Sequence, residues 1–149
     1  MTEPGVPLGP QGQRQLAAVL RVLTRWGVPQ AQQAQLLGFS GRDLRRAQRG
    51  TPPATLSREG QDRLRLVAGI LAALLTLYGR DPGGWLTRPN HRDPFGGRSP
   101  LTVLIAGGLS ALLATHRLLA GDLNGQFSST RESRRRAAAL PQPPIELDG

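Results

Sequence analysis

The sequence predicts an all-α protein, and two observations support this fold class. Apolar residues recur every three or four positions along most of residues 14–120, which is the spacing of helices that bury one face. Residues that favour a helix start precede these stretches, and glycine often follows them. A chain of 149 residues suits one compact domain or two small helical units that share a core.

The first helix is predicted to follow a disordered leader. Residues 1–12 are rich in proline and glycine, so we expect no regular structure there. The helix begins near Arg14 and ends at Gly27, because glycine is the preferred residue after a helix. Its apolar positions are Leu16, Val19, Leu20, Leu23 and Trp26.

Residues 29–49 are predicted to form a helix-turn-helix. The first of the two short helices begins at Pro29, which suits a first helical turn, and runs to about Leu37. A turn containing glycine follows, and Ser40 is a suitable N-cap for the second helix, which ends near Arg49. We assign residues 13–56 to this helix-turn-helix region.

A long central helix is predicted from about Ser57 to Tyr78, with Ser57 or Thr55 as its N-cap and Gly79 beyond its end. Two apolar stripes run along it, so we expect burial on two sides, a role in joining the two halves of the chain, and a contact for a homodimer. The first stripe is Leu64, Val67, Ala68, Leu71, Leu74, Leu75 and Tyr78, and the second is Leu66, Ile70, Ala73 and Leu77.

The C-terminal half is predicted to begin with a short helix. Asp81 followed by Pro82 is a cap-plus-proline helix start, and Pro89 ends the helix after Leu86. Residues 91–98 are then a loop rich in glycine and proline.

A second cap-plus-proline start, at residues 99–100, predicts helical turns to about residue 106 and a last helix over residues 109–120. Residues 57–125 thus form the central helix and a small C-terminal helical domain, followed by a flexible Arg- and Pro-rich tail at 126–149. An alternative for residues 101–108 is a strand that enters a glycine turn. The complete phosphate-binding glycine pattern is absent, and no second parallel strand is available.

The net charge is +9, and every Lys or Arg position is an arginine. A strongly positive chain favours polyanionic partners, nucleic acid first. A compositional bias toward Arg, Ala, Gly and Pro is the alternative explanation, so the position of each arginine matters more than the total.

The sequence lacks the residue patterns of the common catalytic and metal sites. It contains no cysteine and two histidines, and no HExxH or GxSxG motif. We therefore expect neither an enzyme nor a bound cofactor or metal. No signal peptide is evident, and the longest apolar run, residues 66–78, is too short to span a bilayer, so we expect a cytoplasmic protein with no membrane partner.

Four arginines of the second helix of the predicted helix-turn-helix lie on one face. Arg42, Arg45, Arg46 and Arg49 fall at i, i+3, i+4 and i+7. The major groove of DNA admits one helix, and arginine binds phosphates or guanine there. These four arginines and Ser40 are the candidate DNA-binding residues, and a solvated arginine face is the bland alternative.

The segment from residue 84 to 121 has a distinctive order of motifs. W-L-x-x-P-N is followed by F-G, S-P-L and a later glycine. This order resembles the toxin-binding domain of the Xre/MbcA/ParS-like antitoxins, and the upstream helix-turn-helix and long helix are similar too. The resemblance covers about residues 16–125. The residues that it implies shape a partner-binding domain are Trp85, Pro89, Asn90, Phe95, Ser99 and Pro100.

The resemblance implies an antitoxin that binds a RES-domain toxin, occludes its NAD-consuming active site, and represses its own operon at operator DNA. Arg92 and Asp93 in the loop and the extra C-terminal residues depart from the pattern. Glu146 and Asp148 near the C-terminus are candidates for neutralising cations of the toxin pocket, and a disordered tail is the alternative. Two other functions stay open: a free-standing helix-turn-helix regulator without a toxin, and an adaptor that has lost DNA binding.

Overall fold

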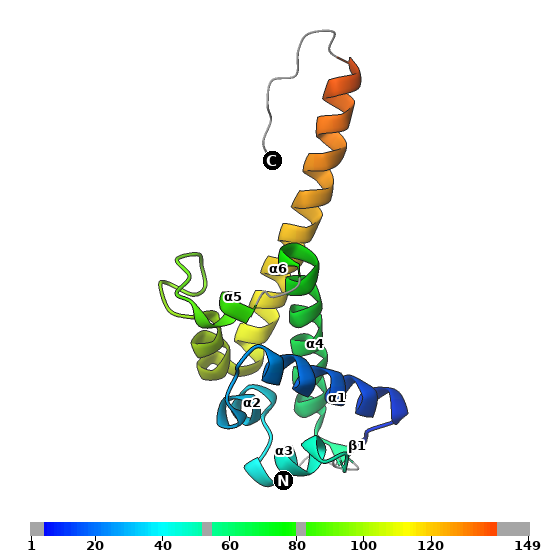
Figure 1. Cartoon of the computed structure of the whole chain (residues 1–149), viewed down its shortest axis with the longest axis vertical. Helices are drawn as coiled ribbons and strands as arrows, with labels where there is room; N and C mark the ends of the chain where they lie inside the picture. Colours follow the sequence, from blue (N-terminus) through cyan, green and yellow to red (C-terminus); the bar gives the residue numbers. More distant parts are fainter. Residues whose placement is uncertain (1–4, 52–54, 80–82, 140–149) are drawn as a thin grey trace.

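The fold is all-α, as the sequence predicts. The computed structural model describes residues 5–51, 55–79 and 83–139, and for residues 126–139 the backbone alone. Within these residues it contains six helices and one pair of two-residue strands. Figure 1 shows the first three helices gathered at one end, with α4 and α6 running away from them.

Helices α1 (Pro10–Arg25), α2 (Gln30–Leu37) and α3 (Gly41–Gln48) form the predicted N-terminal unit. Gly38 ends α2 with a φ of 72°, which glycine adopts at little cost, and Phe39 then leads into the cap of α3. The buried face of this unit is made of Leu16, Val19, Leu20, Leu23, Ala34, Leu36, Leu37, Leu44 and Ala47.

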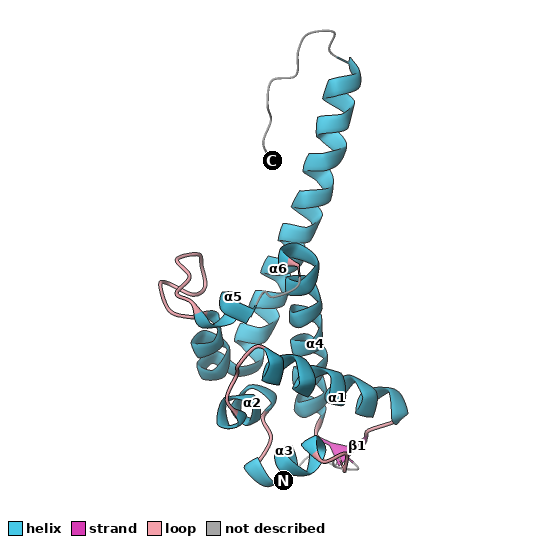
Figure 2. Ribbon diagram, viewed as in Figure 1, coloured by secondary structure: helices cyan, strands magenta, loops and turns pink. Residues whose placement is uncertain are grey.

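The predicted leader is ordered over residues 5–12, so that part of the prediction is wrong. Strand β1 (Val6–Pro7) pairs antiparallel with β2 (Thr55–Leu56), directly before α4, as Figure 2 shows near the label β1. Leu8 is buried, and its carbonyl accepts a hydrogen bond of 3.0 Å from Gln13 Nε2. A partner distant in sequence supplies the order that the local sequence lacks. Residues 1–4 lie outside the described residues.

Helices α4 (Arg58–Tyr78) and α6 (Pro100–Ala139) pack against each other and form the core of the C-terminal half. The cap Ser57 accepts a hydrogen bond of 3.0 Å from Gly60 N, and α4 ends at Gly79 as predicted. The two predicted stripes are only partly buried, because Leu75 and Tyr78 are 40% and 50% exposed. The buried residues of α4 are Leu64, Val67, Ile70, Leu71, Ala73 and Leu74.

Helix α5 (Gly83–Thr87) is the short helix expected before Pro89. Its predicted start at residues 81–82 lies outside the described residues. The loop at 88–98 then leads to α6, where Ser99 Oγ accepts a hydrogen bond of 3.3 Å from Thr102 N and so caps the helix. The cap-plus-proline prediction at this position is confirmed.

Helix α6 bends at Gly108, where the backbone leaves helical geometry with φ 62° and ψ −142°. The predicted interruption between residues 106 and 109 is therefore confirmed, and the strand alternative for 101–108 is wrong. The helix continues to Ala139 and extends beyond the rest of the molecule (Figure 1), so residues 126–139 of the predicted tail are helical, and its flexibility stays a prediction. Residues 140–149, with Glu146 and Asp148, lie outside the described residues.

The first part of α6, residues 100–125, is long and apolar enough to cross a membrane, judged by length and composition alone. The sequence-based search placed the longest apolar stretch in α4 and missed this one, because small and polar residues interrupt it. Core helices of soluble proteins also meet this criterion, and Leu101, Leu104, Leu112 and Leu119 are buried here. Only 28% of its apolar 18-residue window is buried, so the absence of a membrane partner stays a prediction.

Candidate functional site

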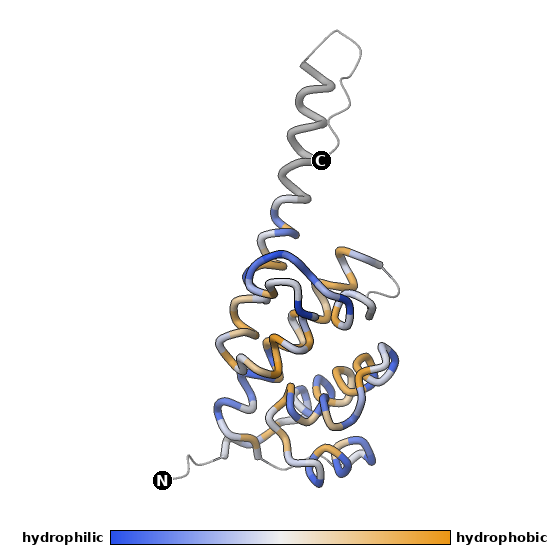
Figure 3. The backbone as a smooth tube through the Cα atoms, turned by 90° about the vertical axis from the view of Figure 1, so that its left-hand side faces the viewer, coloured by the Kyte–Doolittle hydropathy of each residue, from blue (hydrophilic) through white to orange (hydrophobic). Residues whose placement is uncertain are grey.

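The exposed face of α3 carries three of the four predicted arginines, and the fourth, Arg49, is the C-cap that directly follows the helix. Leu44 and Ala47 on the opposite face are buried, which fixes the direction of the arginine face. The arginine-rich α3 is coloured mainly blue in Figure 3. Arg42, Arg45, Arg46 and Arg49 are exposed, and none of them forms an ion pair with a described residue.

Ser40, the fifth predicted DNA-binding residue, is the N-cap of α3. Its Oγ accepts a hydrogen bond of 3.1 Å from Asp43 N. This contact stabilises the first turn and places the N-terminal end of α3 at the surface. A contact between Ser40 and a DNA base stays a prediction.

A glutamine network that the sequence analysis missed holds α2 and α3 together. Gln33 is 1% exposed, and its Nε2 donates to Val28 O at 2.9 Å and to Thr24 Oγ1 at 3.1 Å. Its Oε1 accepts from Gln48 Nε2 at 3.4 Å, while Gln30 Nε2 donates to Gln48 Oε1 at 3.0 Å. A run of glutamines at helical spacing was the only sequence signal for it.

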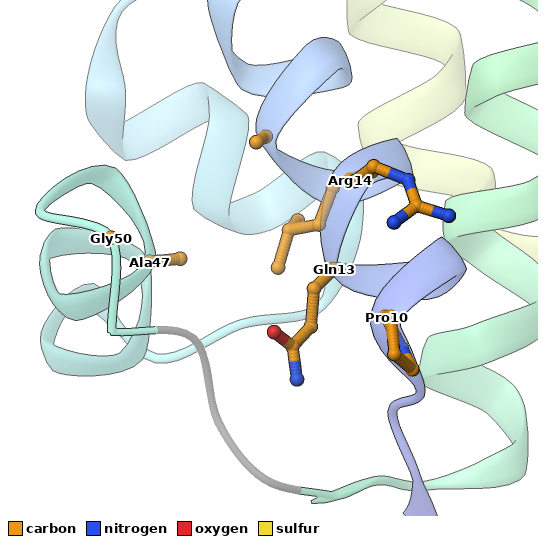
Figure 4. A pocket seen from close by; sticks show the side chains of 7 residues that line it. Pro10, Gln13, Arg14, Ala47 and Gly50 are labelled. Atoms are coloured by element: carbon orange, nitrogen blue, oxygen red, sulfur yellow. The ribbon is translucent and has the colours of Figure 1, made fainter.

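A groove runs between α1 and the C-terminal end of α3. The part of the groove beside the N-terminal half of α1 has a volume of about 320 Å³. Figure 4 shows this part: Ala47 and Gly50 lie on the wall opposite α1, and the guanidinium of Arg14 points away from α3. The wider part, about 620 Å³, has Arg21 and Arg25 on the α1 side. The sequence analysis did not consider α1 as part of a site.

Helix α5 and the loop at 88–98 pack around one aromatic pair. The rings of Trp85 and Phe95 meet edge to face, with centroids 5.5 Å apart. Phe95 has no exposed surface, whereas Trp85 is half-buried. Phe95 is therefore a core residue, and Trp85 remains partly exposed.

The other predicted partner-binding residues shape the same loop. Asn90 bridges it, because its backbone N–H donates to Arg98 O at 3.0 Å and its carbonyl accepts from Gly97 N at 2.8 Å. Asn90 Oδ1 also accepts from Arg92 N at 3.0 Å. Pro100 is buried at the start of α6 next to the cap Ser99, and Pro89 is exposed.

An ion pair fastens this loop to α6. Arg92 donates from both terminal nitrogens to the carboxylate of Asp122, at 2.8 and 3.0 Å. These hydrogen bonds raise the pKa of Arg92 above its ordinary value. The extra loop charge that the sequence analysis noted as a departure from the family pattern thus has a structural use.

Arg63 of α4 lies at the junction of the two halves. Its Nη1 donates to Leu36 O near the end of α2 at 3.5 Å, and its Nε pairs with Glu59 at 3.2 Å. A Cβ placed at Gly108 would lie 3.0 Å from Arg63 Nη2, so the bend in α6 fits around this guanidinium. No described group of three or more His, Cys, Asp or Glu side chains could hold a metal ion.

Comparison with family models adds one finding to this geometry. Residues 2–69 match the antitoxin Xre-like helix-turn-helix domain. The match spans β1 to the middle of α4, which includes the exposed arginine face. It supports an Xre-type antitoxin or DNA-binding regulator, and it confirms the helix-turn-helix.

The Xre-like match ends at residue 69 and leaves α5, the loop and α6 outside it. No curated protein and no solved structure gives a significant match to the chain. The assignment of the C-terminal half therefore depends on its own residues.

Proposed function

We propose that the protein is the antitoxin of a type II toxin–antitoxin pair, which represses its own operon and occludes an NAD-consuming RES-domain toxin. The observation that carries the proposal is the unpaired arginine face of α3 within a domain that matches Xre-like antitoxins. A face of four guanidinium groups on a helix that ends freely at the surface suits the major groove. This role is one of binding and requires no catalysis, a cofactor or a membrane, and a cytoplasmic location accompanies it.

If α3 binds DNA, substituting two of its arginines should weaken the binding. Arg45→Ala with Arg46→Ala removes two exposed charges and leaves the buried Leu44 and Ala47 face intact. We expect weaker binding to the DNA upstream of the operon, with the slope of log K against log salt reduced by about one to two units. A fluorescence anisotropy titration measures it, and binding indistinguishable from the wild type would refute the role of α3.

The toxin-binding part is supported by the loop around Asn90 and the exposed side of Trp85, which carry the antitoxin-like motif. Co-expression with the adjacent gene product, a pull-down and an assay of NAD consumption test it directly. Complex formation with loss of NAD consumption is the expected result. An active neighbouring RES enzyme that the protein neither binds nor inhibits would contradict the proposal.

The alternative is a free-standing helix-turn-helix regulator without a toxin, which the same domain match favours equally. The neighbouring reading frame distinguishes the two, because a RES domain there supports the antitoxin. An adaptor without DNA binding is the third possibility, and the unpaired arginine face argues against it.

We also propose that the protein acts as a homodimer through α4. Leu75 and Tyr78 lie one helical turn apart and are largely exposed, although both belong to the apolar pattern of α4. A symmetric dimer would present two α3 faces to two half-sites of an operator.

A further inference from the structure

We propose that the groove between α1 and α3 holds the sugar–phosphate backbone of DNA, with Arg21 and Arg25 of α1 as its phosphate contacts. The inference depends on the proposed DNA-binding function and extends it to a second helix.

Every charged side chain of α1 is an exposed arginine. Arg14, Arg21 and Arg25 are exposed and fall at i, i+7 and i+11, which places them along one side of the helix. Residues 5–42 contain no Asp or Glu, so no acidic side chain of this stretch competes for them. None of these arginines forms an ion pair with any residue that the structure describes.

The basic side of α1 is continuous with the arginine face of α3. Arg21 and Arg25 line the wider part of the groove together with Gln30 and Gln48. The hydrogen bond between these two glutamines closes the space between α2 and α3. Gln48 lies one turn after Arg45, so the polar rim of the groove connects the α3 face with the α1 side.

The floor of the groove is made of small or apolar side chains. Ala17 and Ala47 leave it open, and a Cβ placed at Gly50 would meet nothing within 4 Å. No carboxylate lines the groove, and about 620 Å³ is accessible in its wider part. A chain of phosphates and sugars fits this combination, because guanidinium groups on one side neutralise the phosphates while the floor contacts the sugars.

Contacts of this kind have a recognisable signature. Phosphate contacts release counterions and so steepen the salt dependence of binding, but they carry no sequence information. Loss of Arg21 and Arg25 should therefore weaken binding to every duplex alike. Loss of base-contacting arginines on α3 should reduce discrimination between sequences.

The experiment compares the wild type with Arg21→Ala/Arg25→Ala on two duplexes, the DNA upstream of the operon and a scrambled version. We expect the slope of log K against log salt to fall in magnitude by about 1.8 on both duplexes, with the ratio of the two affinities unchanged. Arg21→Lys/Arg25→Lys should keep most of the slope. Arg98→Ala/Arg117→Ala removes the same charge from exposed positions in the C-terminal half and should change the slope little.

The outcomes distinguish failure of the proposed DNA-binding function from failure of the proposed phosphate contacts of α1. A wild-type protein that binds neither duplex overturns the proposed DNA-binding function and this inference with it. Wild-type binding with an unchanged slope in the α1 variant overturns the inference alone, as does an equal loss in the Arg98/Arg117 control. Circular dichroism and urea unfolding verify that each variant is folded.

Discussion

At the scale of single residues, the most informative side chain is one that the sequence analysis passed over. Gln33 is almost completely buried between α1, α2 and α3, and hydrogen bonds to Val28, Thr24 and Gln48 satisfy its amide. A buried amide with its partners in place orients the elements around it, whereas one without partners is costly. Gln33 thus fixes the angle at which α3 presents its arginines.

Gln33→Ala should lower the free energy of unfolding by about 2 kcal/mol, because it leaves the buried carbonyl of Val28 without its donor. Gln35→Ala is the matched control, since Gln35 lies on the same helix and is exposed, and its effect should stay within about 0.5 kcal/mol. Urea unfolding followed by circular dichroism measures both. Equal midpoints for the two variants would contradict a structural role for the network.

Residue roles were predictable where they depend on near neighbours in sequence. Ser40, Ser57 and Ser99 cap their helices as the sequence predicts, because a cap requires only the next three residues. The complete burial of Phe95 was not predictable, since it depends on the fold of the loop around Trp85. The exposure of the four α3 arginines follows from helical periodicity, but their ligand does not.

At the scale of elements, the bend in α6 is the feature whose effect on stability can be predicted most directly. Gly108 has a backbone conformation that side chains with a Cβ rarely adopt, and Arg63 approaches it closely. Gly121 lies in the same helix with regular geometry and open space around it. The two glycines therefore differ in what an alanine would do.

Gly108→Ala should destabilise the protein by about 1–3 kcal/mol, because it forces a strained backbone and displaces the Arg63 guanidinium. Gly121→Ala should stabilise it by about 0.5–1 kcal/mol through higher helix propensity. Thermal and urea unfolding of both variants check the opposite signs. Stabilisation by Gly108→Ala would show that α6 is straight at this position in solution.

Helix positions were predicted well because apolar spacing, caps and glycine stops are local signals. The pairing of β1 with β2 was not predictable, because the two strands have two residues each and are separated in sequence by three helices. The exposure of Leu75 and Tyr78 was not predictable either. Periodicity shows which face of α4 is apolar but not how much of that face α6 covers.

At the scale of the whole molecule, the structure separates a basic end from an apolar middle. Arginine faces on α1 and α3 lie at one end, and α4 with α6 forms the apolar part (Figures 1 and 3). The proposed homodimer would use the apolar part and leave both basic ends free. DNA binding and self-association should then be separable by substitution.

Leu75→Glu with Tyr78→Glu should convert the proposed dimer to a monomer, because two charges replace the exposed apolar surface of α4. Light scattering coupled to size-exclusion chromatography should show the molar mass halved. Ala114→Glu, at an exposed position of α6, is the control and should keep the dimer. A wild type that is monomeric throughout the micromolar range would remove the dimer proposal.

The strand pair has a consequence for dissecting the protein. Because β1 and β2 lie beside each other, the polypeptide enters and leaves the three-helix unit at nearly the same point in space. A fragment cut at the predicted boundaries, residues 13–56, would lose Val6 and Leu8 from this closure and expose Leu56. Autonomous folding should instead need a piece that starts by residue 5 and keeps α4.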